Sequence, residues 1–145
     1  MNPLVLSVVA VLVTLPQDAA DPPDLSGLFD AIRQVETGGA PDHGRHAVGD
    51  RGRSLGPYQI SRAYWQDSGL AGAYDNVRDA GYAQRVMLAY WTRYCPAALA
   101  RRDFRTLARI HNGGPSGCRK AATLNYWKRV SRHLAPSAAD PEYVP

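Results

Sequence analysis

Between residues 24 and 133, apolar side chains recur mostly every three or four positions, which is the spacing of one helix face. The first such stretch follows Asp24 and Ser26, either of which can cap a helix, and it stops at Gly38-Gly39. The face that this pattern predicts to pack consists of Leu25, Leu28, Phe29, Ile32 and Val35. We therefore expect a helix here, with Glu36 in its last turn.

Four more stretches show the same periodicity. Ser61 can cap a short helix that bears Tyr64 and Trp65, and the longest pattern starts at Asp79 and stops at Cys95-Pro96. The apolar stripe of that longest helix contains Tyr82, Ala83, Val86, Met87, Tyr90, Trp91 and Tyr94. Two later helices are marked by Phe104, Leu107, Ala108 and Ile110, and by Ala121, Ala122, Leu124, Tyr126, Trp127 and Val130. The pattern predicts a mainly α fold with about five helices.

Residues 40–60 interrupt the helical periodicity. Ala40–Arg53 reads as a loop rich in Gly, Asp, His and Arg, and long loops with little to bury are often functional. Gly56-Pro57 excludes regular helix from Leu55–Ile60. We expect at most a small β-hairpin or strand region here.

The two ends differ from the middle of the chain. Within residues 1–20, an uncharged and largely apolar run extends from Leu4 to Leu15, which is short for a membrane span and typical of a signal peptide. We expect a signal peptide, with an uncleaved N-terminal anchor as the alternative. The chain would then be secreted or periplasmic, without stable membrane insertion after signal cleavage. The folded domain would cover 21–135, and 136–145 would form a flexible tail.

The composition fits one globular domain, in a chain of 145 residues with 45% hydrophobic and 21% charged residues. The sequence does not show the oligomeric state, and we expect a monomer. The formal net charge is +4, but residues 85–133 hold eleven Lys and Arg and one acid, Asp103. Such a basic half favours an anionic partner, although a solvated helical face explains it equally well. Cys95 and Cys118 are expected to form a disulfide in an exported chain and to stay thiols in a reducing compartment.

Glu36 is the first candidate for chemistry. It continues the face of Phe29 and Ile32 and lies where the helix dipole disfavours a negative charge. Partial burial and that dipole both raise the pKa of a carboxyl, as a general acid requires. From this pattern alone, a surface glutamate beside a helix stop is the simpler interpretation.

Asp50 is the candidate for a second carboxyl. It lies in a glycine-rich loop beside Arg51 and Arg53, whose positive charges favour an ionised carboxylate. One protonated and one ionised carboxyl on unlike backbones are what glycoside hydrolysis needs. Asp50 can equally be an ordinary turn residue, and Asp42 is a rival for the same role.

Further candidates come from polar and aromatic side chains. The string His111-Asn112-Gly113-Gly114-Pro115 is typical of a helix end, but an adjacent His and Asn can also hydrogen-bond a sugar. Tyr58, Tyr64 and Trp65 can either pack or contact a ligand, whereas the stripe of the longest helix is expected in the core.

Other kinds of site are not indicated. His43 and His46 lack companion ligands, so no metal site and no cofactor are predicted. The chain carries no phosphate-binding glycine loop, no serine-hydrolase elbow and no nucleic-acid signature beyond its charge, so no nucleic-acid partner is expected.

Three strings together resemble the invertebrate-type, or destabilase-like, lysozymes. They are Val-Glu-Thr-Gly-Gly at 35–39, Gly-Asp-Arg-Gly-Arg-Ser-Leu-Gly-Pro-Tyr-Gln-Ile at 49–60, and Ala-Arg-Ile-His-Asn-Gly-Gly-Pro-Ser-Gly-Cys at 108–118. The resemblance covers roughly residues 26–133. The family is usually cysteine-rich, and Gly38-Gly39 replaces a cysteine expected near the glutamate.

The resemblance implies a lysozyme-like catalytic domain over 21–135. It implies hydrolysis of the β-1,4 bond between N-acetylmuramic acid and N-acetylglucosamine in peptidoglycan, by a retaining route, with Glu36 as general acid and Asp50 as nucleophile or stabiliser. Joined to the residue arguments, it predicts a set of substrate-binding residues: Tyr58, Gln59, Tyr64, His111 and Asn112.

Three alternative functions stay open. Some family members combine muramidase action with isopeptidase action, for which Ser54 or Ser61 with His111 or Lys120 would serve. A lytic transglycosylase needs only the glutamate. A non-catalytic wall-binding module would keep the fold without turnover.

Overall fold

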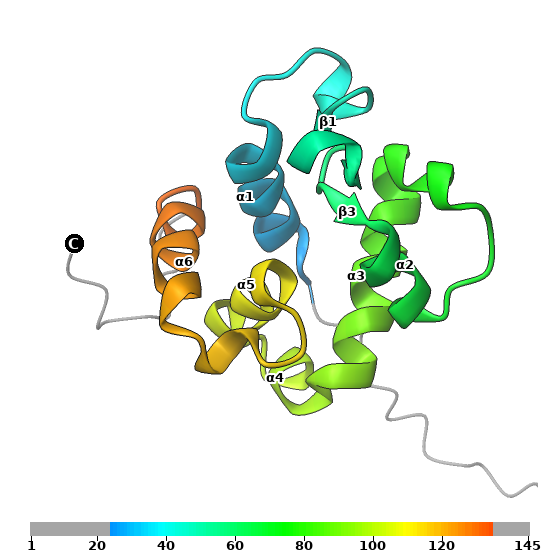
Figure 1. The fold of residues 1–145 in the computed structure, drawn as a ribbon. Coiled ribbons are helices and arrows are strands. Elements are labelled where there is room, and N and C mark those ends of the chain that lie inside the picture. The colour runs from blue at the N-terminus through cyan, green and yellow to red at the C-terminus, as the bar shows by residue number, and fades with distance from the viewer. Residues whose placement is uncertain (1–23, 135–145) are drawn as a thin grey trace, which may run out of the picture.

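A computed structural model of the chain describes residues 24–134, and this part is mainly α-helical (Figure 1). It contains six α-helices: α1 (Ser26–Thr37), α2 (Arg62–Ser68), α3 (Ala80–Tyr94), α4 (Pro96–Ala100), α5 (Phe104–Gly113) and α6 (Leu124–Ser131). Short 3-10 helices connect them: η1 (Asp42–Gly44), η2 (Asp50–Gly52), η3 (Tyr74–Arg78), η4 (Gly117–Arg119) and η5 (Ala121–Thr123). The predicted fold class is confirmed.

One helix is additional to the predicted five. The pattern marks Cys95-Pro96 as a stop, and α3 does end at Tyr94. Pro96 then begins α4, because a proline in the first turn of a helix lacks only an N–H that would have no helical partner.

The predicted strand region is a three-stranded antiparallel sheet of two-residue strands: β1 (Val48–Gly49), β2 (Ser54–Leu55) and β3 (Ile60–Ser61). Leu55 lies opposite Val48 in β1 and opposite Ile60 in β3. The turn after β2 needs glycine, because Gly56 has φ +76° and a Cβ there would lie 2.4 Å from the Val77 carbonyl oxygen. The sheet is thereby held directly against η3.

The core is built around α3. Its buried stripe contains Tyr82, Ala83, Val86, Met87, Tyr90 and Trp91. Trp91 is fully buried, stacks on Phe29 of α1 and donates a hydrogen bond from Nε1 to the Leu107 carbonyl of α5. Each fully buried aliphatic side chain in such a core stabilises the fold by roughly 1.5–3 kcal/mol. The expectation that this stripe packs rather than binds ligand is confirmed, with Tyr94 half-buried at its end.

Two helix caps lie at predicted positions. The Ser61 hydroxyl accepts the Tyr64 N–H at the start of α2, and the Asp79 carboxylate accepts the Tyr82 N–H at the start of α3. Asp103 caps α5 in the same way, by accepting the Thr106 N–H. Such caps satisfy N–H groups that have no helical partner and contribute about 1 kcal/mol each. The predicted cap of α1 does not form, because the cap position is Leu25 without a side-chain cap, although Asp24 Oδ1 accepts the Ser26 N–H.

Figure 1 shows α6 on one side of α1, α5 below α1, and the small sheet with α2 and α3 on the other side. Helix α1 contacts both α5 and α6. Residues 24–134 contain no helix with the length and apolar content needed to cross a membrane. The predicted N-terminal segment 1–20 and tail 136–145 lie outside the described residues.

The predicted disulfide between Cys95 and Cys118 is not formed in this structure. Cys95 and Cys118 are both free thiols here, half-buried and packed against the core. Burial raises the pKa of the Cys95 thiol to about 11, and the nearby Cys118 and Asp103 act in the same direction. Cys95 in this state is therefore a packing residue rather than a reactive thiolate.

Candidate active site

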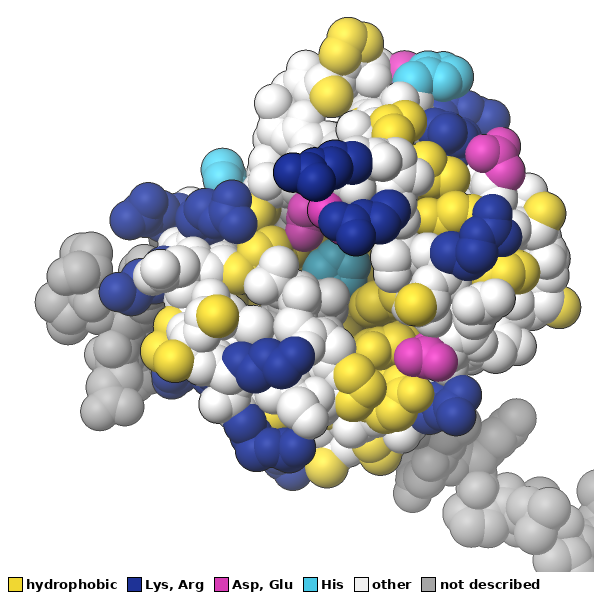
Figure 2. Space-filling view, in the orientation of Figure 1, with side chains coloured by type: hydrophobic (Ala, Val, Ile, Leu, Met, Phe, Trp, Pro, Cys, Tyr) yellow, Lys and Arg dark blue, Asp and Glu magenta, His cyan; other side chains and the backbone are white. Residues whose placement is uncertain are grey.

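A cleft of about 390 Å³ opens where the end of α1, the sheet, α2 and the end of α5 meet. It is lined by Glu36, Asp50, Ser54, Gln59, Ser61, Tyr64, His111 and Asn112. Figure 2 shows a hollow in the middle of one face, with acidic and histidine side chains in it and Lys or Arg side chains beside it. Six of the seven predicted catalytic and binding residues therefore lie in one place.

Glu36 forms the buried wall of this cleft. Its side chain is 19% exposed, and its Oε1 accepts a 2.7 Å hydrogen bond from the Tyr126 hydroxyl of α6. Burial raises the pKa of the Glu36 carboxyl, while the Tyr126 hydrogen bond and the charge of Arg129 lower it by less. The net effect favours the protonated form, which is the form a general acid needs.

His111 lies beside Glu36 and is itself buried. Its Nε2 is 3.7 Å from Glu36 Oε1, and its Nδ1 is 3.5 Å from the Tyr64 hydroxyl. Burial lowers the pKa of His111 from 6.5 to about 4, against a smaller opposing effect of a backbone hydrogen bond at Tyr58. The imidazole is therefore neutral at neutral pH, so it neither forms an ion pair with Glu36 nor favours ionisation of that carboxyl.

Asp50 forms the open wall. Its side chain is 59% exposed, and its Oδ1 accepts a 2.8 Å hydrogen bond from Arg53 Nη2, whose Nε also donates to the Asp50 backbone carbonyl. Asp50 and Arg51 both have left-handed backbone angles, with φ of +48° and +57°. Non-glycine residues adopt this conformation at a cost, and such positions concentrate at functional sites. The tight η2 turn holds the carboxylate at the mouth of the cleft.

Gln59 reaches the cleft through a specific close approach. Its side-chain amide donates to the Gly56 carbonyl, and its Oε1 would lie 2.0 Å from a Cβ at Gly49. A Cβ at position 49 would therefore displace the end of the Gln59 side chain from this position. Asn112 reaches the same cleft from the last turn of α5, where it is exposed.

Tyr58 is the predicted binding residue that does not line the cleft. It is 1% exposed, lies edge-on to Phe29, and its hydroxyl accepts a hydrogen bond from Gln84. The turn at Gly56 directs Tyr58 into the core and leaves the next residue, Gln59, to face the cleft. Trp65 also packs inside, donating from Nε1 to the Tyr82 hydroxyl.

The residues proposed as rivals or for alternative functions also differ in whether they line the cleft. Asp42 does not line the cleft, so it is not placed to act with Glu36. Lys120 donates to the Gly113 carbonyl rather than lining the cleft. Ser54 and Ser61 do line the cleft, but the Ser61 hydroxyl caps α2, and the ring nitrogens of His111 face Tyr64 and Glu36.

Sequence reasoning missed the role of Tyr126. The helical spacing predicts Tyr126 only as a core residue of the last helix, and it is indeed 3% exposed. Its hydroxyl nevertheless meets a carboxyl 90 residues earlier in the chain. Residues 24–134 contain no cluster of three or more His, Cys, Asp or Glu side chains that could hold a metal ion.

Comparisons with known proteins bear on this geometry. The family model described as destabilase matches residues 31–133. Lysozyme from Ostrea edulis is 34% identical over 129 residues, which cover 88% of this chain and 90% of that relative. Lysozyme 1 from Crassostrea virginica is 40% identical over 79 residues, but that match covers only 53% of this chain and 43% of the relative.

The fold has solved relatives as well. The crystal structure of Meretrix lusoria lysozyme in complex with Aeromonas hydrophila PliI matches with a TM-score of 0.60 and 30% sequence identity. The match covers 73% of this chain and 87% of that chain. Because the family model covers most of the chain and the relatives agree with it in sequence and in fold, the chain belongs to the destabilase family, whose relatives named here are lysozymes.

Proposed function

We propose that the chain is a muramidase that hydrolyses the β-1,4 bonds between N-acetylmuramic acid and N-acetylglucosamine in peptidoglycan. The observation that supports it is the pairing, in one cleft, of a buried carboxyl with a raised pKa and an exposed carboxylate held by an arginine. Glycosidases need this pair, because one group must give a proton while the other stays negative. The lysozyme names of the relatives agree with the same chemistry.

In the proposed reaction, Glu36 transfers its proton to the glycosidic oxygen as the bond to the anomeric carbon breaks. Asp50 faces the positive charge that develops on that carbon, either stabilising it or forming a covalent bond to it. Water then adds to the anomeric carbon and gives one proton to Glu36; where Asp50 has formed a bond to that carbon, this bond breaks and the carboxylate is released. Neutral His111 adds no charge to the surroundings of Glu36 while this occurs.

Substrate contacts would come from polar groups that already line the cleft. Gln59 and Asn112 offer amide donors and acceptors to sugar hydroxyl and N-acetyl groups, and Ser54 and Ser61 offer hydroxyls. Tyr64 stacks on Tyr90 with ring centroids 3.8 Å apart, so its ring is fixed before any sugar arrives. Because a rigid site has little conformational freedom to lose, the entropy cost of binding a sugar is reduced.

The test is product analysis by mass spectrometry of purified peptidoglycan treated with wild type, Glu36→Gln and Asp50→Asn. We expect muropeptides with reducing ends from wild type and a loss of at least roughly a hundredfold in each variant. Asp42→Asn is the matched control, because Asp42 is an exposed carboxylate with a left-handed backbone that lies outside the cleft. It should retain wild-type turnover.

Other products would overturn the proposal. Anhydro ends with an active Asp50→Asn variant would identify a lytic transglycosylase. Cleaved peptide cross-links that disappear in Ser54→Ala or Ser61→Ala would identify an isopeptidase. Wall binding by a folded wild type without any product would identify a non-catalytic module.

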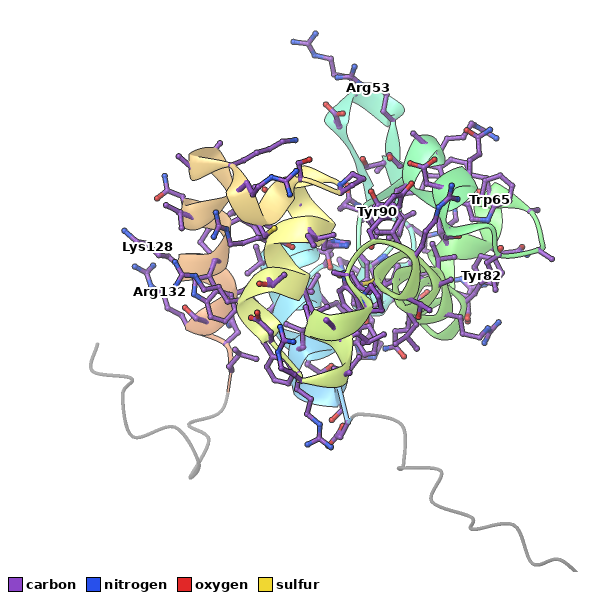
Figure 3. All side chains as sticks on the ribbon, turned by 90° about the horizontal axis from the view of Figure 1, so that it is seen from below. Arg53, Trp65, Tyr82, Tyr90, Lys128 and Arg132 are labelled. Carbon is purple, nitrogen blue, oxygen red and sulfur yellow. The ribbon has the colours of Figure 1, made fainter. Side chains whose placement is uncertain are left out.

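The basic half supports a second part of the proposal, which is attraction to an anionic wall. Figure 3 shows Lys128 and Arg132 pointing outward from α6, and residues 101–134 hold nine Lys and Arg against Asp103. Attraction between exposed charges is screened by salt, so cosedimentation with purified walls should fall between low and physiological ionic strength. Binding that does not depend on salt would contradict this part.

Export and a Cys95–Cys118 bridge complete the proposal. The apolar N-terminal run favours a signal peptide, and an oxidising compartment would allow the two nearby thiols to form a disulfide. Thiol labelling of protein recovered from the culture medium, with and without prior reduction, tests both points together.

A further inference from the structure

We propose that Tyr126 is a positioning residue for Glu36: its hydroxyl fixes Oε1, so that the transferable proton resides on Oε2. This inference rests on the proposed role of Glu36 as general acid. The carrying observation is the 2.7 Å hydrogen bond from the Tyr126 hydroxyl to Oε1, made between α6 and the last turn of α1. Nothing in the local sequence around either residue indicates the contact.

The geometry distinguishes the two oxygens of the carboxyl. Oε1 lies against both the Tyr126 hydroxyl and His111 Nε2, whereas no hydrogen bond from any described residue reaches Oε2. A tyrosine hydroxyl that donates to Oε1 leaves that oxygen as an acceptor. A proton on the carboxyl is therefore placed on Oε2, the oxygen left free for a substrate in the cleft that Glu36 lines.

Tyr126 is itself firmly held and does not line the cleft. Its ring is buried, its hydroxyl meets Glu36, and the Arg129 guanidinium lies 5.5 Å from the ring centroid. It consequently acts through Glu36 and does not touch the substrate. Fixing one carboxyl oxygen also fixes the rotation of the whole group, and small displacements of an acid lower its efficiency strongly.

The hydrogen bond matters most when the proton leaves. As Glu36 gives up its proton, negative charge spreads to Oε1, and a hydrogen bond to a charged acceptor is stronger than one to a neutral acceptor. The contact is thus stronger in the transition state than in the ground state, which is the condition for an effect on kcat. The same contact opposes the effect of burial on the pKa of Glu36.

Several other groups face Glu36 and bear on its pH dependence. Helix α6 contributes Arg129 besides Tyr126, α5 contributes His111, and Asp50 lies across the cleft. The 3-10 helix η1, which packs against α1, contributes the exposed side chains of Asp42 and His43. None of these changes in a Tyr126→Phe variant, so a shifted profile in that variant reports on the one hydroxyl.

The experiment compares kcat, KM and the pH profile of wild type and Tyr126→Phe on a soluble peptidoglycan oligosaccharide. We expect kcat to fall roughly ten- to hundredfold with KM nearly unchanged, because the lost bond forms with a charged acceptor in the transition state. We also expect the alkaline limb of the profile to move to higher pH. The reason is that removal of a donor to the ionised form raises the pKa of Glu36 further.

Tyr82→Phe is the matched control. Its side chain is also buried, and its hydroxyl makes two hydrogen bonds, from Trp65 and to the Ala71 carbonyl, away from Glu36. We expect Tyr82→Phe to lose about as much stability as Tyr126→Phe but to keep the pH profile of wild type. An alkaline limb in Tyr126→Phe that coincides with that of wild type, together with unchanged kcat, would overturn the proposal.

Two further measurements separate the possible failures. Glu36→Gln, assayed in parallel, tests the proposed function itself. If Glu36→Gln is active, Glu36 is not the general acid. If Glu36→Gln is inactive and Tyr126→Phe behaves like wild type, only the inference about Tyr126 is wrong. If Tyr126→Phe does not fold, carbon NMR of wild type replaces it. The Tyr126 ring carbon that bears the hydroxyl should titrate together with the Glu36 carboxyl, and a resonance that does not follow Glu36 would overturn the proposal.

Discussion

The two walls of the cleft are built in opposite ways. Glu36 sits on a regular helix, 19% exposed, against Tyr126 and His111, which come from α6 and α5. Asp50 sits in a tight η2 turn, 59% exposed, and its side-chain partner Arg53 is three residues away. One carboxyl is thus surrounded by distant, mostly neutral groups, and the other by a local positive charge and water.

This contrast shows how one fold gives two chemically similar groups different environments. Burial removes water from Glu36 and raises its pKa, while no comparable burial acts on Asp50. The environment of Glu36 needs the packing of the whole fold, because several elements must close around this side chain. The environment of Asp50 needs only a short loop.

The largest expected effect comes from shortening the buried acid. Glu36→Asp retracts the carboxyl by one methylene from both Tyr126 and the cleft, and a displacement of about 1 Å can cost a hundredfold in rate. We expect kcat to fall roughly a hundredfold or more, as measured on a soluble oligosaccharide. Retention of more than a tenth of the wild-type activity would show that catalysis does not depend on the exact position of the Glu36 carboxyl.

A second prediction concerns stability and pH at the buried wall. His111 has a pKa of about 4 in the folded chain against 6.5 ordinarily, so between these values the unfolded chain binds a proton that the folded chain does not. The free energy of unfolding should therefore fall as pH decreases from 6.5 towards 4, by about 3 kcal/mol from this residue. Above pH 6.5 this contribution is fully retained.

Denaturant titrations of wild type and His111→Gln across this pH range check the second prediction. Glu36, with a raised pKa, contributes with the opposite sign in both proteins, so the difference between them isolates His111. His43→Gln, which changes an exposed histidine, is the control. Equal slopes in wild type and His111→Gln would contradict the burial argument.

The smallest effect is expected at the open wall. Arg53→Gln breaks an exposed ion pair with Asp50, and such pairs contribute about 0.2–1 kcal/mol because both ends are solvated. We expect a melting temperature close to that of wild type and a loss of activity of several-fold, since Asp50 is less firmly oriented. A large drop in melting temperature would mean that the Arg53–Asp50 contact stabilises the fold and does not merely orient the Asp50 carboxylate.

The local parts of the fold could be predicted from the chain itself. Helical spacing marked α1, α2, α3, α5 and α6, and residues with side-chain acceptors marked the caps at Ser61 and Asp79. Pro96 was ambiguous, because proline ends one helix and begins another equally well. Gly56-Pro57 indicated a turn but not its direction, which is why Tyr58 was expected in the cleft and lies in the core.

What the sequence by itself determined is therefore five of the six helices in residues 24–134, the small strand region and most of the residues that line the cleft. Periodicity, capping and turn formation act between neighbours in the chain, so they can be read without knowing the fold. Only the tertiary structure decided that Tyr126 meets Glu36 across 90 residues, that His111 is buried beside them and that Asp42 is excluded. These outcomes depend on how α1, α5 and α6 pack, and it is this packing that sets the burial and hydrogen bonds on which the acidity of Glu36 depends.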